Sequence, residues 1–129
     1  FFYSLKKHTH ICIWTTKKKK GECFDYVIKC VGQDIHADRL WKRYLTFLKK
    51  SVGAKSGEEI DRIRRVYHKA LRIPMDNLEQ IWDSYVLWEQ NTNKDLAEAL
   101  IDVHREAYNL AQQVHKDRKR YRRGIILHF

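Results

Sequence analysis

The chain has 129 residues, of which 43% are hydrophobic, and it contains one proline and five glycines. This length allows about one domain with a modest core, and this composition excludes a collagenous chain and argues against a disordered one. The formal net charge of +10 would suggest an anionic partner if the basic residues shared one folded face.

The basic residues gather at the two ends of the chain. Residues 1–20 contain six lysines and no acidic residue, and residues 116–123 contain six basic residues beside Asp117. Once these are subtracted from the totals of 26 basic and 16 acidic residues, the rest of the chain holds 14 basic and 15 acidic residues. The central region is therefore nearly neutral, and the positive charge belongs to the ends.

The cysteines and the hydropathy predict a soluble protein of a reducing compartment. Cys12, Cys23 and Cys30 contain no C-x-x-C pair, and an odd number cannot close a disulfide framework. No apolar run approaches the ~20 residues that span a bilayer, and the lysine-rich start lacks the apolar region of a signal peptide. Because the chain begins with Phe1 rather than methionine, we expect it to be part of a longer protein.

Residues 1–21 show no sustained helical or strand period and are predicted to form an irregular leader. His8, His10 and Cys12 could present three metal ligands on one side of a strand, but no second ligand pair with zinc spacing follows. We therefore predict no metal site here. From residue 22 the apolar spacing becomes helical, and this first helix is expected to stop at Gly32.

The next two helices are predicted over residues 37–51 and 57–72. Ser56 and Glu59 have the spacing of a capping box, in which each side chain satisfies a backbone amide of the other residue. Pro74 cannot continue the second of these helices, because its ring removes a backbone donor and clashes with the preceding turn.

A fourth helix is predicted from Leu78 to about residue 91, with a cap formed by Asp76 and Glu79, and a fifth starts near Lys94. The buried stripe of the fifth helix is predicted to follow 4-3-4-3-4 steps: Leu96, Leu100, Val103, Ala107, Leu110 and Val114. The short breaks between helices favour antiparallel neighbours, so the chain is predicted to be a string of helical hairpins.

An internal repeat is visible in the aromatic residues. Trp41 and Tyr44 recur 41 positions later as Trp82 and Tyr85, and each pair opens the first helix of a hairpin. Residues three apart share a helix face, so each pair is predicted to fill the space between hairpins. Stacking on nucleic-acid bases is the alternative, but the surrounding leucines favour burial.

The repeat resembles the half-a-TPR (HAT) repeat, which has Trp-x-x-Tyr and an acidic residue in its first helix, and Arg-x-Tyr before a proline in its second. The matching positions are Trp82, Tyr85, Glu89, Arg65, Tyr67 and Pro74. The first copy departs from the pattern, because Leu48 stands where the acid would be and residues 52–56 lengthen the loop. Arg65 is expected to pair with Glu89 or Asp83 across the hairpins.

Residues 63–67 and the string from Pro74 to Tyr85 are similar to the N-terminal HAT region of the suppressor of forked family, the scaffold subunit of cleavage stimulation factor and its yeast counterpart in cleavage factor IA. The resemblance covers about residues 23–121. It implies a nuclear, non-catalytic α-solenoid that bridges other cleavage and polyadenylation subunits and dimerises through a region outside this chain.

The remaining polar patterns give no support for catalysis or for a cofactor. Glu98, Asp102 and Glu106 stand four apart, but a di-metal carboxylate site would need Glu-x-x-His, and Ile101 and Asn109 occupy those positions. We predict a solvated acidic face. The chain also lacks a phosphate-binding glycine loop and a nucleophile elbow, so we predict no enzymatic activity.

The basic residues near the end of the chain are candidate contacts for RNA or an acidic partner: Lys116, Arg118, Lys119, Arg120, Arg122 and Arg123. Such clusters attract phosphate by releasing counterions. The alternative is a solvated helix end whose cations favour the C-terminal dipole.

The predicted fold is all-α, with antiparallel helical hairpins stacked as an α-α superhelix. We expect a leader over residues 1–21, a HAT-repeat domain over residues 22–123 and a tail over residues 124–129. The repeat-packing residues are predicted to be Trp41, Tyr44, Tyr67, Pro74, Trp82, Tyr85 and Glu89. The predicted function is a protein–protein scaffold in pre-mRNA 3′-end cleavage and polyadenylation; the alternative is a HAT protein of splicing or ribosomal RNA processing that contacts RNA through its basic end.

Overall fold

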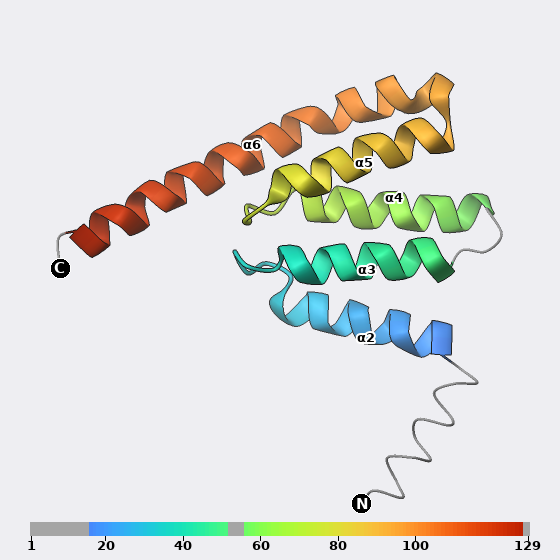
Figure 1. The fold of residues 1–129 in the computed structure, drawn as a ribbon, viewed down its shortest axis with the longest axis horizontal. Coiled ribbons are helices and arrows are strands. Elements are labelled where there is room, and N and C mark those ends of the chain that lie inside the picture. Colours follow the sequence, from blue (N-terminus) through green and yellow to red (C-terminus); the bar gives the residue numbers. More distant parts are fainter. Residues whose placement is uncertain (1–15, 52–55, 128–129) are drawn as a thin grey trace, which may run out of the picture.

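The computed structural model describes residues 16–51 and 56–127, and the described residues form helices with no strand (Figure 1). The helices are α2 (Thr16–Val31), α3 (Asp38–Ser51), α4 (Gly57–Leu71), α5 (Leu78–Thr92) and α6 (Lys94–Leu127). The all-α prediction is confirmed. Within the described residues, no helix combines the length and the apolar character needed to cross a membrane.

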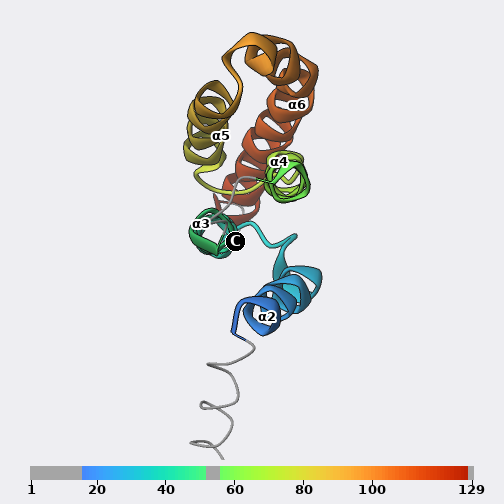
Figure 2. The ribbon, with the colours of Figure 1, turned by 90° about the vertical axis from the view of Figure 1, so that its right-hand side faces the viewer.

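The helices stack in two layers, with α3 and α5 in one layer and α2, α4 and α6 in the other (Figure 2). Each helix packs against its neighbours in the chain, and further contacts join α3 to α5 and α4 to α6. The long α6 runs along α5 and continues beyond its end (Figure 1). This arrangement is the stack of helical hairpins that the short breaks predict.

The start of α4 forms half of the predicted capping box. Ser56 is the N-cap, and its hydroxyl oxygen accepts a hydrogen bond from the backbone N–H of Glu59 at 3.4 Å. One buried carboxylate oxygen of Glu59 has no hydrogen-bond partner, so this oxygen does not accept the reciprocal hydrogen bond of the capping box. The helix ends at Leu71, with Arg72 as its C-cap, before Pro74.

The first described helix begins at Thr16 rather than at the predicted residue 22. A run of lysines has no apolar period, but lysine is a good helix former, so the pattern conceals a helical segment. Gly21 is buried where α2 approaches α3 and α4, and a Cβ at this position would lie 3.4 Å from the Arg62 guanidinium. The glycine is therefore a packing position inside the helix. At the other end, α6 continues to Leu127, inside the predicted tail.

The core runs through the middle of the stack from α3 to α6. Its buried apolar side chains are Ala37, Trp41, Tyr44, Leu45, Leu48, Ile63, Val66, Tyr67, Ala70, Leu71, Ile73, Met75, Leu78, Ile81, Tyr85, Ala97, Ile101 and Ala111. In the first repeat Leu48 is buried, so an apolar side chain takes the place of the acidic residue of the repeat pattern.

The predicted buried stripe of α6 is wrong for three of its large aliphatic residues, which are exposed. Leu96, Val103 and Leu110 are 56%, 71% and 67% exposed. The buried face lies about one residue further along and contains the small side chains of Ala97 and Ala111, which allow a close approach to the stack. The helix carries two adjacent apolar stripes: the buried one also contains Ile101, and the outward one contains Leu96, Val103 and Leu110.

Candidate functional site

The two Trp-x-x-Tyr pairs take different positions in the stack. Trp41, Tyr44 and Tyr85 are at most 2% exposed, whereas Trp82 is only partly buried. The indole N–H of Trp41 donates to the carbonyl of Gly32 at 3.0 Å, so this side chain also ties α3 to the end of α2. Trp41, Tyr44 and Tyr85 therefore lie in the core, whereas Trp82 packs against its edge.

Tyr44 connects α3 to α2. Its hydroxyl donates to a carboxylate oxygen of Asp25 at 2.5 Å, and its ring stacks on Phe24 with a centroid separation of 5.1 Å. Burial and the hydrogen bond to Asp25 raise the pKa of the Tyr44 hydroxyl. Asp25 also forms an ion pair with Arg62 of α4 at 3.6 Å. One tyrosine therefore joins apolar packing to a polar link between three helices.

Trp82 connects α5 to α6. Its ring stacks on Tyr108 with a centroid separation of 4.5 Å and an angle of 5° between the ring planes. The hydroxyl of Tyr108 in turn accepts a hydrogen bond from the side-chain amide of Gln112 at 2.7 Å. Offset stacking of this kind adds about 0.5–1.5 kcal/mol beyond the burial of apolar area.

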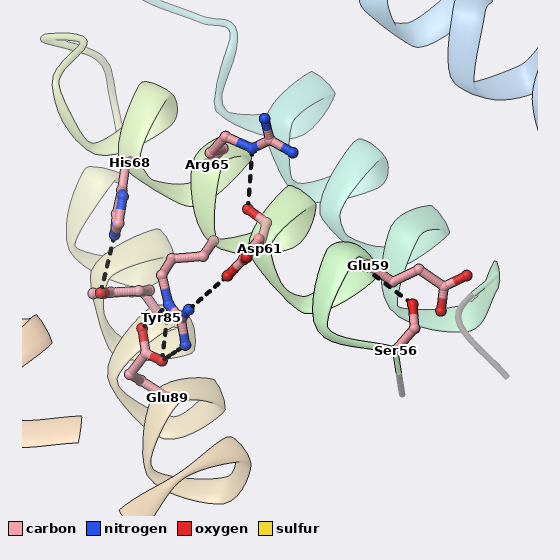
Figure 3. Close-up of polar contacts among 8 residues, drawn as sticks. Ser56, Glu59, Asp61, Arg65, His68, Tyr85 and Glu89 are labelled. Atoms are coloured by element: carbon pink, nitrogen blue, oxygen red, sulfur yellow. Dashed lines mark hydrogen bonds and ion pairs between the residues drawn. The ribbon is translucent and has the colours of Figure 1, made fainter. Parts of the chain in front are cut away.

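Glu89, labelled in Figure 3, forms the central ion pair of the molecule. Its partner is Arg64. The carboxylate is fully buried, and the Arg64 guanidinium donates to it at 2.6, 3.1 and 3.2 Å. The predicted partner, Arg65, is exposed and instead donates to the backbone carbonyl of Asp61 at 3.3 Å. A one-residue step turns a side chain by about 100° around a helix, which separates the two arginines. The predicted pairing of Arg65 with Glu89 is therefore wrong.

A pair of histidines lies next to this ion pair. The His68 ring of α4 stacks on the His104 ring of α6 with a centroid separation of 3.4 Å. The ring nitrogen Nε2 of His68 is hydrogen-bonded to the Tyr85 hydroxyl at 3.1 Å (Figure 3). Burial and the buried carboxylate of Glu89 raise the pKa of Tyr85. Sequence reasoning missed both histidines, because neither stands in a recognisable motif.

The histidine pair predicts that the fold loses stability in mild acid. Burial, and next the facing His104, lower the pKa of His68 from its ordinary 6.5 to about 4, and burial also lowers the pKa of His104. The unfolded chain then binds more protons than the folded chain as pH falls from about 6.5 to 4, so this contribution is complete above pH 6.5 and declines through that window. Urea unfolding at pH 7.5, 6 and 5 should show a falling midpoint.

The matched control for this prediction is His68→Gln, which keeps a polar group near the Tyr85 hydroxyl. The midpoint of this variant should change less between pH 7.5 and 5 than that of the parent chain. Equal pH dependence in the two proteins would contradict the assignment to His68.

Asp76 joins three parts of the chain. One carboxylate oxygen lies 2.9 Å from Nδ1 of His36, and the other lies 3.0 Å from Nε2 of the buried His115 and 3.9 Å from the Lys119 ammonium. Asp76 therefore links the loop before α3 and the loop before α5 to the middle of α6. No short-range sequence signal could reveal contacts between residues 39 and 40 positions apart.

The structure also corrects the predicted N-terminal cap of α5. Asn77, not Asp76, is the N-cap residue; it has a positive φ of 56° and makes no capping hydrogen bond through its side chain. Its amide nitrogen donates to Asp38 at 3.1 Å instead. The acidic and amide side chains at this helix start are therefore used in tertiary contacts.

The candidate basic contact residues are all exposed in the last turns of α6: Lys116, Arg118, Lys119, Arg120, Arg122 and Arg123. Lys116, Lys119, Arg120 and Arg123 are three or four residues apart, so they share one helix face, and Arg118 and Arg122 lie on another. Lys119 lies within ion-pair distance of Asp76, which leaves Lys116, Arg120 and Arg123 on that face without an ion pair to any described residue.

Among the described residues, no three histidine, cysteine or acidic side chains gather in a way that could hold a metal ion. His8, His10 and Cys12 lie outside the described residues. On α6, Glu98, Asp102 and Glu106 are exposed, and Asp102 forms an ion pair with Arg105 at 3.0 Å. This stripe is a solvated helix face with a local ion pair.

Comparison with known proteins identifies relatives of this chain. Residues 6–128 match the family described as Suppressor of forked protein, so the match includes most of the segment predicted to be a leader. Cleavage stimulation factor subunit 77 of Arabidopsis thaliana is 31% identical over 108 residues, covering 81% of this chain and 15% of the relative. Protein suppressor of forked of Drosophila melanogaster is 30% identical over 122 residues, covering 92% of this chain and 16% of the relative.

Fungal and structural relatives point the same way. The mRNA 3′-end-processing protein RNA14 of Saccharomyces cerevisiae is 33% identical over 92 residues, covering 69% of this chain and 14% of the relative. The crystal structure of CstF-77 superimposes with a TM-score of 0.71 at 20% identity, covering 81% of this chain and 23% of that chain. This chain therefore spans about a seventh of the length of these curated relatives.

Proposed function

The chain belongs to the suppressor of forked family, and from that premise we propose that it contributes a non-catalytic protein–protein scaffold to pre-mRNA 3′-end cleavage and polyadenylation in the nucleus. The family match over residues 6–128 carries this proposal. The names of the relatives from Arabidopsis thaliana and Saccharomyces cerevisiae, a cleavage stimulation factor subunit and an mRNA 3′-end-processing protein, support it.

The arrangement of the polar groups fits a scaffold. Buried polar side chains pair with residues of other helices or loops, as Glu89 does with Arg64 and Asp38 does with Asn77. Such pairs fix the geometry of a stack. The partners we propose are other subunits of the cleavage and polyadenylation machinery, with dimerisation through a region outside this chain.

Affinity capture tests the proposal. The tagged chain is incubated with nuclear extract, with and without ribonuclease, and the bound proteins are identified by mass spectrometry. Ribonuclease-resistant recovery of cleavage and polyadenylation subunits is the expected result. Recovery of spliceosomal or ribosome-biogenesis proteins in their place would overturn it.

Direct contact with RNA is a second candidate function, favoured by the exposed cations at the end of α6. We propose that Lys116, Arg120 and Arg123 contact phosphates. For single strands the logarithm of the binding constant falls with the logarithm of salt by about 0.7 per phosphate contact. Replacing all three residues with alanine should therefore reduce the slope measured with a labelled single-stranded RNA by about 2.

The matched control replaces three exposed cations elsewhere: Arg39, Lys50 and Lys69. This triple-alanine variant has the same net charge as the α6 variant, so a general electrostatic effect would change both alike. Equal salt slopes for the two variants would contradict a phosphate contact at α6.

A further inference from the structure

A groove runs between α2 and α3 at the α2 end of the stack, with a cavity volume of about 570 Å³. Its apolar lining comes from Phe24 and Val27 of α2 and from Leu40 and Phe47 of α3. Val27 is 39% exposed, although it is one of the residues that give α2 its helical apolar spacing. The groove therefore presents apolar surface to solvent within the described part of the chain.

The groove also carries one sign of charge. Lys20, Arg43 and Lys50 line it, and none of the described residues that line it is acidic. These three cations are exposed and form no ion pair with any described residue, whereas Arg62, on the neighbouring α4, is paired with Asp25. An apolar lining beside three cations is complementary to a segment that combines apolar and acidic side chains.

The helices already in the stack indicate the shape of the occupant. In the layer formed by α3 and α5, α3 packs against α2 and α4, and α5 packs against α4 and α6. Among the described helices, α2 packs against only one helix of that layer, α3 (Figure 2). A groove between two antiparallel helices accepts a third helix that presents apolar residues at i, i+3, i+4 and i+7. The composition of residues 1–15, which contain Lys6 and Lys7 and no acidic residue, is not complementary to the cations.

We propose that the groove between α2 and α3 binds an acidic amphipathic helix of a partner protein. The apolar side chains of the partner helix contact Phe24, Val27, Leu40 and Phe47, and its carboxylates pair with Lys20, Arg43 and Lys50. This proposal rests on the proposed scaffold function, because it takes the partner to be a protein. Its test uses purified components, so that failure of one proposal is distinguishable from failure of the other.

The test uses a synthetic probe with the proposed chemistry. A fluorescein-labelled peptide of about 16 residues, long enough to form a helix in a groove, carries leucine at i, i+3, i+4 and i+7 and glutamate on the flanking faces. Fluorescence anisotropy with the full chain should show saturable binding that weakens as salt increases. A peptide of the same composition with scrambled leucines should bind at least about tenfold more weakly.

Paired variants locate the binding site. Arg43→Glu should weaken binding by about tenfold or more, while Arg39→Glu, the same change at an exposed position of α3 outside the groove, should leave it nearly unchanged. Val27→Asp should act in the same way, with Val31→Asp as its control on α2. Circular dichroism establishes that each variant is folded, so a loss of binding does not reflect unfolding.

Four results would overturn the proposal. They are the absence of saturable binding, equal binding of the scrambled peptide, equal effects of Arg43→Glu and Arg39→Glu, and binding that occurs only after residues 1–15 are deleted. The last result would assign the groove to the chain's own leading segment. Recovery of processing subunits by affinity capture would stand in all four cases, because that experiment does not depend on the groove.

Discussion

Replacing Arg64 with methionine is expected to lower the free energy of unfolding by about 3 kcal/mol, the largest effect of any single polar substitution considered for this fold. The change removes the guanidinium that donates three hydrogen bonds to Glu89 and leaves that fully buried carboxylate without its counter-charge. Methionine preserves much of the apolar stem, so the loss reports mainly on the charge. Urea unfolding followed by circular dichroism measures it.

The adjacent arginine provides the matched control. Arg65→Met removes the same charge from the same helix, but Arg65 is exposed, and among the described residues it donates only to a backbone carbonyl of its own helix. Its expected cost is below about 0.5 kcal/mol. A larger loss from Arg65→Met than from Arg64→Met would reinstate the pairing predicted from the repeat pattern and contradict the structure.

Trp41→Ala is expected to cost about 3–5 kcal/mol, and Trp82→Ala about 1–2 kcal/mol. Trp41 is 2% exposed, and its removal leaves a large cavity and the Gly32 carbonyl without its donor. Trp82 is partly exposed and loses chiefly its stack on Tyr108. Thermal and urea unfolding of the two variants measure the difference.

Trp41→Phe separates the two contributions at the first site. Phenylalanine fills most of the cavity but cannot donate to Gly32, so this variant should lose about 1–2 kcal/mol. Equal losses from Trp41→Ala and Trp82→Ala would show that the two copies of the repeat are energetically equivalent, which is what the sequence alone suggests and what the structure denies.

The central helices could be predicted from the sequence because local chemistry marks their ends. The helices predicted over 37–51 and 57–72 are observed as Asp38–Ser51 and Gly57–Leu71, bounded by Ser56 and followed by Pro74. Where no cap or proline marks an end, the prediction was wrong: α2 begins at Thr16 and α6 continues to Leu127. Lysine and arginine runs permit a helix without giving it an apolar period.

Which side chains of a helix face the core could be predicted only where the helix has a single dominant apolar stripe. In α5 the buried residues Leu78, Ile81 and Tyr85 are three and four residues apart and form one stripe. In α6 two apolar stripes lie side by side, and hydrophobic spacing cannot tell which one meets α5 and which one faces outward. The same limit applies to Arg64 and Arg65, since the repeat pattern fixes the helix that supplies the arginine but not the phase of that helix.

The polar contacts between hairpins could not be predicted, because they depend on how loops and helices meet in space. His36, Asp76 and His115 converge from two loops and the middle of α6. His68 and His104 meet only when α4 and α6 pack together. Nothing in the local sequence distinguishes these residues from ordinary surface side chains.

The layered stack also implies that resistance to local opening is unevenly distributed along the chain. Helix α4 is supported by α3, α5 and α6, whereas α2 packs along α3 and reaches α4 through the Asp25–Arg62 ion pair. In a quasi-one-dimensional array, each unit is held by its neighbours, so the interior units open only with the whole and the end units open on their own. Amide protons of α4 therefore report the cooperative unfolding of the molecule, while those of α2 report a fraying that leaves the rest of the array intact.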